Sequence, residues 1–139
     1  MSDVAPCDIA AALGTPDAAA SPGARAPGGV DARVVLVTAP GEEAAERLVT
    51  ALVTEGLVAC GTIVPGALSI YRWGGALERE REAVVLLKTT EAGVARVLAR
   101  LPALHPYDVP ELLVLPVEAG HPPYLAWLAE SVRTLQERG

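Results

Sequence analysis

The sequence predicts an α+β protein with a ferredoxin-like fold, a β-α-β-β-α-β antiparallel sheet with a long hairpin between its second and third strands and a C-terminal helix. Three observations lead to this prediction. Apolar, β-branched runs alternate with helical patterns in that order, residues 57–89 form one very long hairpin pattern, and Gly74-Gly75 suits a two-residue turn. Such a fold places two helices on one face of the sheet and leaves the other face or the edges for partners.

The chain divides into an extension and one domain. Residues 1–31 are dominated by Ala, Pro and Gly and contain almost no large apolar side chains, so we expect them to be disordered. Residues 32–139 carry the periodic patterns. With 51 % hydrophobic residues overall, the chain has enough apolar material for a core.

Composition narrows the classes of partner. The formal net charge is -6 and the basic residues are scattered, which argues against nucleic acid and against an anionic membrane surface. No apolar stretch approaches the roughly 18 residues of a membrane helix, and the N-terminus does not resemble a signal peptide. The two cysteines, Cys7 and Cys60, form neither a disulfide framework nor a zinc pattern. We therefore expect a cytoplasmic protein.

The first strand and helix follow from short, clear patterns. Residues 33–38 are an apolar, β-branched run that predicts a buried strand. Residues 42–55 have an apolar stripe at helical spacing and glutamates in the first turns, where the helix dipole favours negative charge. Gly56 supplies the stop signal.

The hairpin is too long for its own domain. An unbroken arm over residues 57–73 would reach roughly 55 Å, whereas a compact body of this size is about 35 Å across. Pro65-Gly66 is expected to form a bulge or bend midway. An apolar overhang with an unpaired edge requires cover from another subunit, so we expect an obligate oligomer.

The C-terminal part contains two more helices and a strand. Residues 91–101 predict a helix that Thr90 caps and that Pro102 and Pro106 end. Residues 109–117 predict the last core strand, which its prolines restrict to an edge or to bulged ends. Pro122-Pro123 is expected to open a short helix that runs from residue 124 to about residue 135.

Several motifs, taken together, resemble those of the CutA divalent-cation-tolerance family. They are V-T-A-P at residues 37–40, A-C-G-T-I-V-P-G-A-L-S-I-Y-R-W at 59–73, K-T-T at 88–90, H-P-Y-D-V-P-E-L at 105–112 and P-Y-L-A-W at 123–127. The resemblance implies a ferredoxin-like protomer in a tight homotrimer, with the hairpins packing between subunits. It also implies a cytoplasmic protein linked to tolerance of copper and other divalent cations.

The resemblance carries over the metal ligands of the family only in part. Members similar to this sequence can have a Cys immediately before T-A-P and two consecutive His before Pro-Tyr. Val37 and Leu104 occupy two of these positions here, so only His105 remains of that set.

Two residues are candidate metal ligands on chemical grounds. His105 offers a neutral imidazole in a Pro-bounded loop, although it could equally be a loop histidine bonded to backbone that helps to place Tyr107. Cys60 offers a soft thiolate suited to Cu(I), although a small Cys in a buried strand more often serves packing. Copper or another divalent metal is the expected ligand.

A second set of residues is expected to line clefts between subunits. Glu111 lies in an otherwise apolar strand and needs a partner, for which Lys88 is a candidate in a structural ion pair or a ligand site. The aromatic residues cluster in the hairpin and the C-terminal third, where core and trimer packing is the alternative use. The predicted cleft residues are Lys88, Glu111, Tyr71, Trp73, Tyr107 and Trp127. Residues 78–82 alternate Glu and Arg, which predicts a solvated or cross-subunit edge rather than a metal cluster.

Two functions follow as expectations. The first is a trimeric divalent-cation-tolerance protein that binds metal ions, copper among the candidates. The alternative is a trimeric small-ligand sensor or signalling scaffold with intersubunit clefts and an unidentified protein partner. No enzyme is expected, because the sequence shows no glycine-rich phosphate loop and no recognisable nucleophile or metalloprotease motif.

Overall fold

The computed structural model describes residues 30–132. The expected disorder of residues 1–31 falls almost wholly outside this range, as do Cys7 and the end expected for the last helix, near residue 135. The elements in chain order are β1 (Ala32–Ala39), α1 (Glu42–Thr54), β2 (Cys60–Trp73), β3 (Ala76–Thr90), the 3₁₀ turn η2 (Glu91–Gly93), α2 (Val94–Leu104), β4 (Leu112–Pro116) and α3 (Pro122–Ser131).

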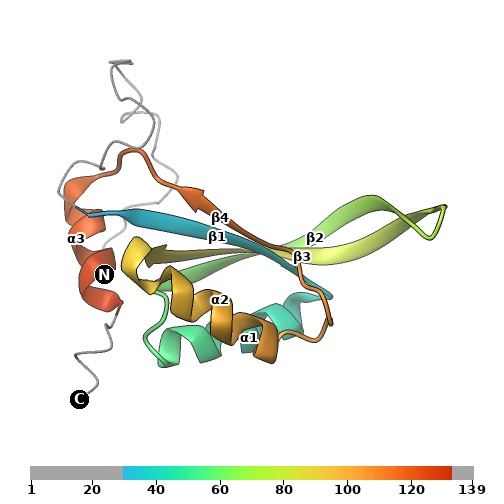
Figure 1. Cartoon of the computed structure of the whole chain (residues 1–139), viewed down its shortest axis with the longest axis horizontal. Coiled ribbons are helices and arrows are strands. Elements are labelled where there is room, and N and C mark those ends of the chain that lie inside the picture. Colours follow the sequence, from blue (N-terminus) through green and yellow to red (C-terminus); the bar gives the residue numbers. More distant parts are fainter. Residues whose placement is uncertain (1–29, 133–139) are drawn as a thin grey trace.

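The four strands form one antiparallel sheet in the order β2-β3-β1-β4. Figure 1 shows α1 and α2 together on one side of this sheet, and α3 at the end opposite the hairpin tip. The predicted ferredoxin-like arrangement is thus confirmed. Among residues 30–132, β4 pairs only with β1, so Pro116 at its end costs no pairing on a second side.

The core lies between the sheet and the two helices. Alternate residues of β1 and β3 point toward the helices, and the predicted stripe of α1 meets them, as does one side of α2. The fully buried large side chains of this core include Val35, Val37, Leu52, Val85, Leu87, Val97 and Leu101. A smaller cluster at the α3 end joins Ala32, Ala59, Leu125, Leu128 and Val132.

The hairpin extends well beyond the body, as predicted (Figure 1). β1 pairs with β3 only from Ala83 onward, so residues 67–73 and 76–82 form a two-stranded ribbon, which we call the arm. Gly74 and Gly75 have φ of 60° and 83°, which suits the two-residue turn. A bulge interrupts the pairing between Val64 and Ala67, where Pro65-Gly66 predicted one.

The second helix differs from the prediction at both of its ends. Residues 91–93 form a 3₁₀ turn because the Thr90 hydroxyl accepts the Gly93 N–H at 3.3 Å and tightens the start. The predicted end at Leu101 is wrong, because the helix runs through Pro102 and ends before Pro106. Pro102 removes only its own hydrogen bond, and α2 continues to Leu104, where the His105 N–H bonds the Leu101 carbonyl at 3.0 Å.

The last strand and the last helix are also displaced. β4 covers Leu112–Pro116 rather than 109–117, because Pro110 has no N–H to donate to the ladder. α3 begins at Pro122 and not at the predicted Tyr124, and Pro122-Pro123, which were expected to open the helix, occupy its first turn, where no N–H is needed. Within residues 30–132, no helix is long and apolar enough to cross a membrane.

Candidate functional site

An open groove lies where the arm leaves the body. Its volume is about 750 Å³. The arm supplies one wall down to Glu82, and the end of β1 with the loop between α2 and β4 supplies the base. The lining residues are Thr38, Ser69, Ile70, Tyr71, Trp73, Glu78, Glu80, Glu82, Tyr107, Val109 and Glu111. They include four carboxylates and three aromatic side chains, and none of them is basic.

Strand alternation gathers the glutamates of the groove. Residues two apart in a strand share a face, so Glu78, Glu80 and Glu82 point to the same side of β3. Tyr71 lies directly opposite Glu78, and Ser69 lies opposite Glu80. The pKa of the exposed Tyr71 phenol is raised, first by partial desolvation and then by the negative charges of these glutamates.

A hydrogen-bonded pair closes the base of the groove. The Tyr107 hydroxyl donates to Glu82 Oε2 at 2.9 Å, and Glu82 is only 8 % exposed. Burial, followed by this bond and the negative charge of Glu82, raises the pKa of Tyr107 to about 12. The phenol therefore stays protonated and serves as a fixed donor to the carboxylate.

His105 holds the loop that carries Tyr107. It is 7 % exposed, its Nε2 lies 2.7 Å from the Thr38 carbonyl oxygen, and its Nδ1 accepts the Tyr107 N–H at 3.0 Å. These two bonds define a neutral imidazole with the proton on Nε2. The ring thus has the backbone-bonded arrangement that was the alternative to a metal ligand, and a metal would have to displace one of the bonds.

Cys60 lies in a different region, near α3. Its Sγ is 3.7 Å from the Tyr124 hydroxyl, and the Tyr124 ring packs against Trp127 with centroids 5.6 Å apart. Burial raises the pKa of Tyr124 to about 12, with the contact to the thiol contributing second. In the sheet, Cys60 lies opposite Lys88 of β3. Thr38, whose carbonyl is bonded by His105, lies opposite Val84, four positions from Lys88 along the same strand.

The two candidate metal ligands are therefore not brought together in one protomer. Four strand positions correspond to about 13 Å along β3. Among residues 30–132, no three His, Cys, Asp or Glu side chains are grouped so that they could hold a metal ion.

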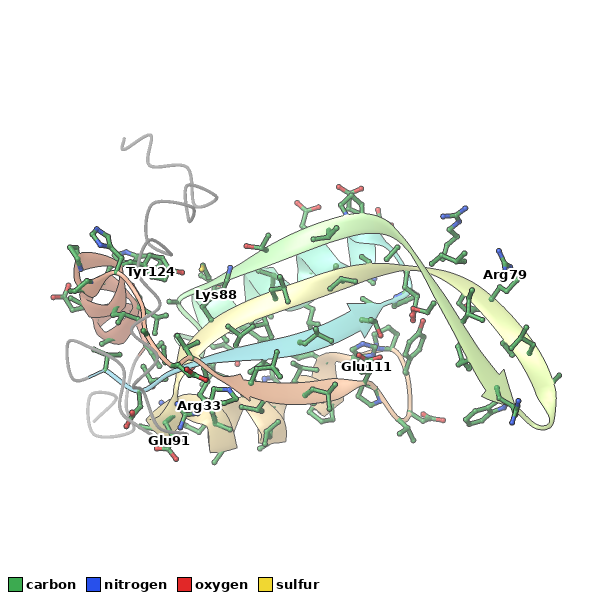
Figure 2. The ribbon with its side chains drawn as sticks, turned by 90° about the horizontal axis from the view of Figure 1, so that it is seen from above. Arg33, Arg79, Lys88, Glu91, Glu111 and Tyr124 are labelled. Atoms are coloured by element: carbon green, nitrogen blue, oxygen red, sulfur yellow. The ribbon has the colours of Figure 1, made fainter. Side chains whose placement is uncertain are left out.

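The structure brings together four of the six predicted cleft residues. Tyr71, Trp73, Tyr107 and Glu111 all line the groove. Lys88 instead donates to the Thr62 hydroxyl at 2.7 Å, and Figure 2 shows Lys88 and Glu111 well separated along the sheet. Trp127 lies with Tyr124 at the α3 end.

Glu78, Glu80 and Glu82 were not included in the predicted site. The alternation of residues 78–82 indicated one acidic face, but nothing local indicated that the loop after α2 would meet it. The positions of Glu78 opposite Tyr71 and of Glu80 opposite Ser69 would have followed from extending the strand pairing back from the Gly74-Gly75 turn.

Together, the strand order, the projecting arm and the groove at its root define a ferredoxin-like domain with a long exposed ribbon. The model of the CutA1 divalent ion tolerance protein family matches residues 33–131, and the chain belongs to this family. The divalent-cation tolerance protein CutA of Thermus thermophilus is 48 % identical over 98 residues, covering 70 % of this chain and 95 % of that protein.

Solved structures agree with this assignment. Rice CutA1 (Oryza sativa) superposes with a TM-score of 0.73 at 40 % identity, covering 75 % of this chain and 95 % of that one. A protein of Archaeoglobus fulgidus, described as the periplasmic divalent cation tolerance protein CutA, gives a TM-score of 0.71 at 32 % identity. That superposition covers 73 % of this chain and 99 % of the Archaeoglobus chain.

Proposed function

We propose that this protein acts in divalent-cation tolerance as a cytoplasmic homotrimer that binds divalent cations, copper among them, near its subunit boundaries. The observation that carries this proposal is the groove, in which carboxylates gather beside an exposed apolar arm. Family membership supplies the link to metal tolerance.

The arm supports assembly. Trp73 is 73 % exposed and Leu77 is 69 % exposed, and other large apolar side chains of the arm are also open to solvent. Contiguous exposed apolar surface marks interaction sites, and a ribbon beyond the body has backbone edges that a second chain can cover. A homotrimer would bury this surface and enclose three copies of the groove.

The base of the groove supports cation binding. Glu82 and Glu111 place two carboxylates there, and clustered negative charge raises the local concentration of cations. Among first-row divalent ions, Cu²⁺ binds a given set of nitrogen, oxygen and sulfur donors most tightly. Copper(II) is therefore the ion we expect to bind with the highest affinity, and Cys60 offers a separate soft donor for Cu(I).

A calorimetric titration tests this proposal. The mass-verified oligomer is titrated with Cu(II), Zn(II) and Mn(II), and anaerobically with Cu(I). We expect saturable Cu(II) binding at one site per chain that weakens at least tenfold in Glu111→Gln. Glu118→Gln, at an exposed position after β4, is the matched control and should bind normally. Absence of saturable binding, or equal affinity in both variants, would refute the site.

Two further variants test the other candidate ligands. His105→Ala should weaken Cu(II) binding if the imidazole gives up one of its backbone bonds to the metal. Cys60→Ser should affect only Cu(I), because the thiol lies at the α3 end, away from the groove. Loss of Cu(II) binding in Cys60→Ser would place the site near α3 instead.

The alternative function is a small-ligand sensor or signalling scaffold that communicates with a protein partner. One observation favours it: Tyr71, Trp73 and Tyr107 stand beside the carboxylates, a combination that suits organic cations. Quenching or a shift of Trp73 fluorescence on ligand addition, in a Trp127→Phe background, would support this function. We assign no catalytic reaction. A Cys60–His105 pair would have to lie within hydrogen-bond distance, and the strand positions of the two regions are about 13 Å apart along β3.

A further inference from the structure

The arm carries opposite charges on its two faces. The acidic face carries Glu78, Glu80 and Tyr71 and borders the groove. The basic face carries Arg72, Arg79 and Arg81 with three exposed apolar side chains, because across the strands Arg81 pairs with Leu68, Arg79 with Ile70 and Arg72 with Leu77. Figure 2 shows Arg79 extending away from the ribbon, on the opposite side from Glu111.

Each face combines charge with exposed apolar area. Leu68 and Leu77 on the basic face are 40 % and 69 % exposed, and Tyr71 and Trp73 on the acidic face are 42 % and 73 % exposed. Two such faces are complementary to each other and not to themselves. Bringing two acidic or two basic faces together would place like charges opposite one another, which costs several kcal/mol.

This polarity restricts how copies of the chain can associate. In a two-fold dimer the same patch meets itself, so a single face of the arm would meet its own charge. A head-to-tail contact instead joins the acidic face of one copy to the basic face of the next. Repeated around an axis, head-to-tail contacts close into a ring, and a homotrimer is such a ring.

We propose that, in the homotrimer, the acidic face of each arm receives the basic face of a second copy's arm, with Arg79 and Arg81 of that copy facing Glu78 and Glu80. This inference rests on the trimer of the proposed function and specifies its pairing. The arginines would neutralise the outer wall of the groove and complete it. Glu82 and Glu111 at the base would remain as the carboxylates available to a cation.

Charge exchange tests the pairing. The two double variants are Arg79→Glu/Arg81→Glu and Glu78→Arg/Glu80→Arg. A quadruple variant combines all four substitutions. It keeps the formal net charge at -6 because the changes of -4 and +4 cancel. Subunit exchange between isotope-labelled and unlabelled protein is followed by native mass spectrometry. We expect each double variant to exchange at least about tenfold faster, and the quadruple variant to return to within about threefold of wild type.

Two measurements keep the test decisive if a variant loses structure. Circular dichroism and thermal unfolding report on the fold of each variant. The single variants Arg79→Glu and Arg47→Glu make the same change of charge, on the arm and on the exposed surface of α1 respectively. We expect only Arg79→Glu to speed exchange, and high salt to speed the exchange of the wild type.

The outcomes separate this inference from the proposed function. If the wild type is a trimer and both double variants exchange subunits at the wild-type rate, the pairing is overturned and the trimer stands. The same holds if the folded quadruple variant exchanges no more slowly than the double variants. Equal effects of Arg79→Glu and Arg47→Glu overturn it as well. A monomeric wild type overturns the trimer and the pairing together.

Discussion

Replacing Tyr107 with Phe removes one hydroxyl and tests the bond that closes the base of the groove. That hydroxyl donates to Glu82 at 2.9 Å, and the carboxylate is 8 % exposed, so water replaces the lost donor poorly. A hydrogen bond to a charged group contributes about 1.5–3 kcal/mol. Because the groove is open, we expect the lower part of this range, a fall of about 1.5–2 kcal/mol in the free energy of unfolding, measured by denaturant titration at neutral pH.

The same bond predicts a dependence on pH. The pKa of Tyr107 is raised to about 12 by burial and by Glu82, against about 10 in an unfolded chain. The folded state therefore binds the phenolic proton more tightly. The stabilisation that the protonated Tyr107 hydroxyl gives to the folded state is complete below about pH 10 and is lost as the pH rises toward about 12. The difference in stability between wild type and Tyr107→Phe should shrink across that interval.

Tyr124→Phe is the matched control. Its hydroxyl also has a pKa of about 12, but it faces the Cys60 sulfur at 3.7 Å, a much weaker contact. We expect a loss below about 0.5 kcal/mol. All proteins are compared at one chain concentration, since assembly would shift the apparent stability. Equal losses in the two variants, or a Tyr107→Phe difference that persists unchanged to pH 12, would refute the reasoning.

Three further predictions concern packing, the turn and a surface ion pair. Gly61→Ala would place its Cβ 2.8 Å from Val49 Cγ1, so unfolding measurements should show a loss of about 1–3 kcal/mol; an unchanged midpoint would contradict the overpacking. In Gly75→Ala the new Cβ meets no neighbour, but the residue must adopt φ near 83°. We expect a loss of about 1 kcal/mol in the free energy of unfolding and faster hydrogen exchange at the arm tip. Unaltered exchange would argue against backbone strain. Arg100→Gln breaks a bidentate pair with Glu55 whose side chains are 44 % and 31 % exposed. Thermal unfolding should register only a small loss of stability that shrinks further in high salt, and a loss that grows with salt would exclude a screened surface pair.

The hairpin was predictable because its signals are local. Gly74-Gly75 specifies a turn with positive φ, and Pro65-Gly66 marks the bulge regardless of what packs nearby. The overhang followed from strand length alone. The end of α2 was not predictable in the same way, because a helix can continue past Pro102 when it loses only one bond within its last turn.

The groove was predictable only in part because it joins segments that are distant in sequence. The aromatic character of the arm pointed to Tyr71 and Trp73, and Glu111 was recognised as a carboxylate in need of a partner. The Tyr107–Glu82 bond depends on where the loop after α2 meets β3, which no local pattern states. Lys88 and Trp127 were included by residue type, and tertiary structure places them at the other end of the sheet.

The bulge in β2 also determines what the arm displays. β2 advances three residues, from Val64 to Ala67, where β3 advances two, from Val84 to Glu82. This extra residue reverses the side to which every later residue of β2 points. The Gly74-Gly75 turn holds Tyr71 opposite Glu78, so the extra residue is absorbed at the bulge and not in the arm. As a result Val64 and Tyr71, which strict alternation would place on opposite faces, lie on the same face of the hairpin.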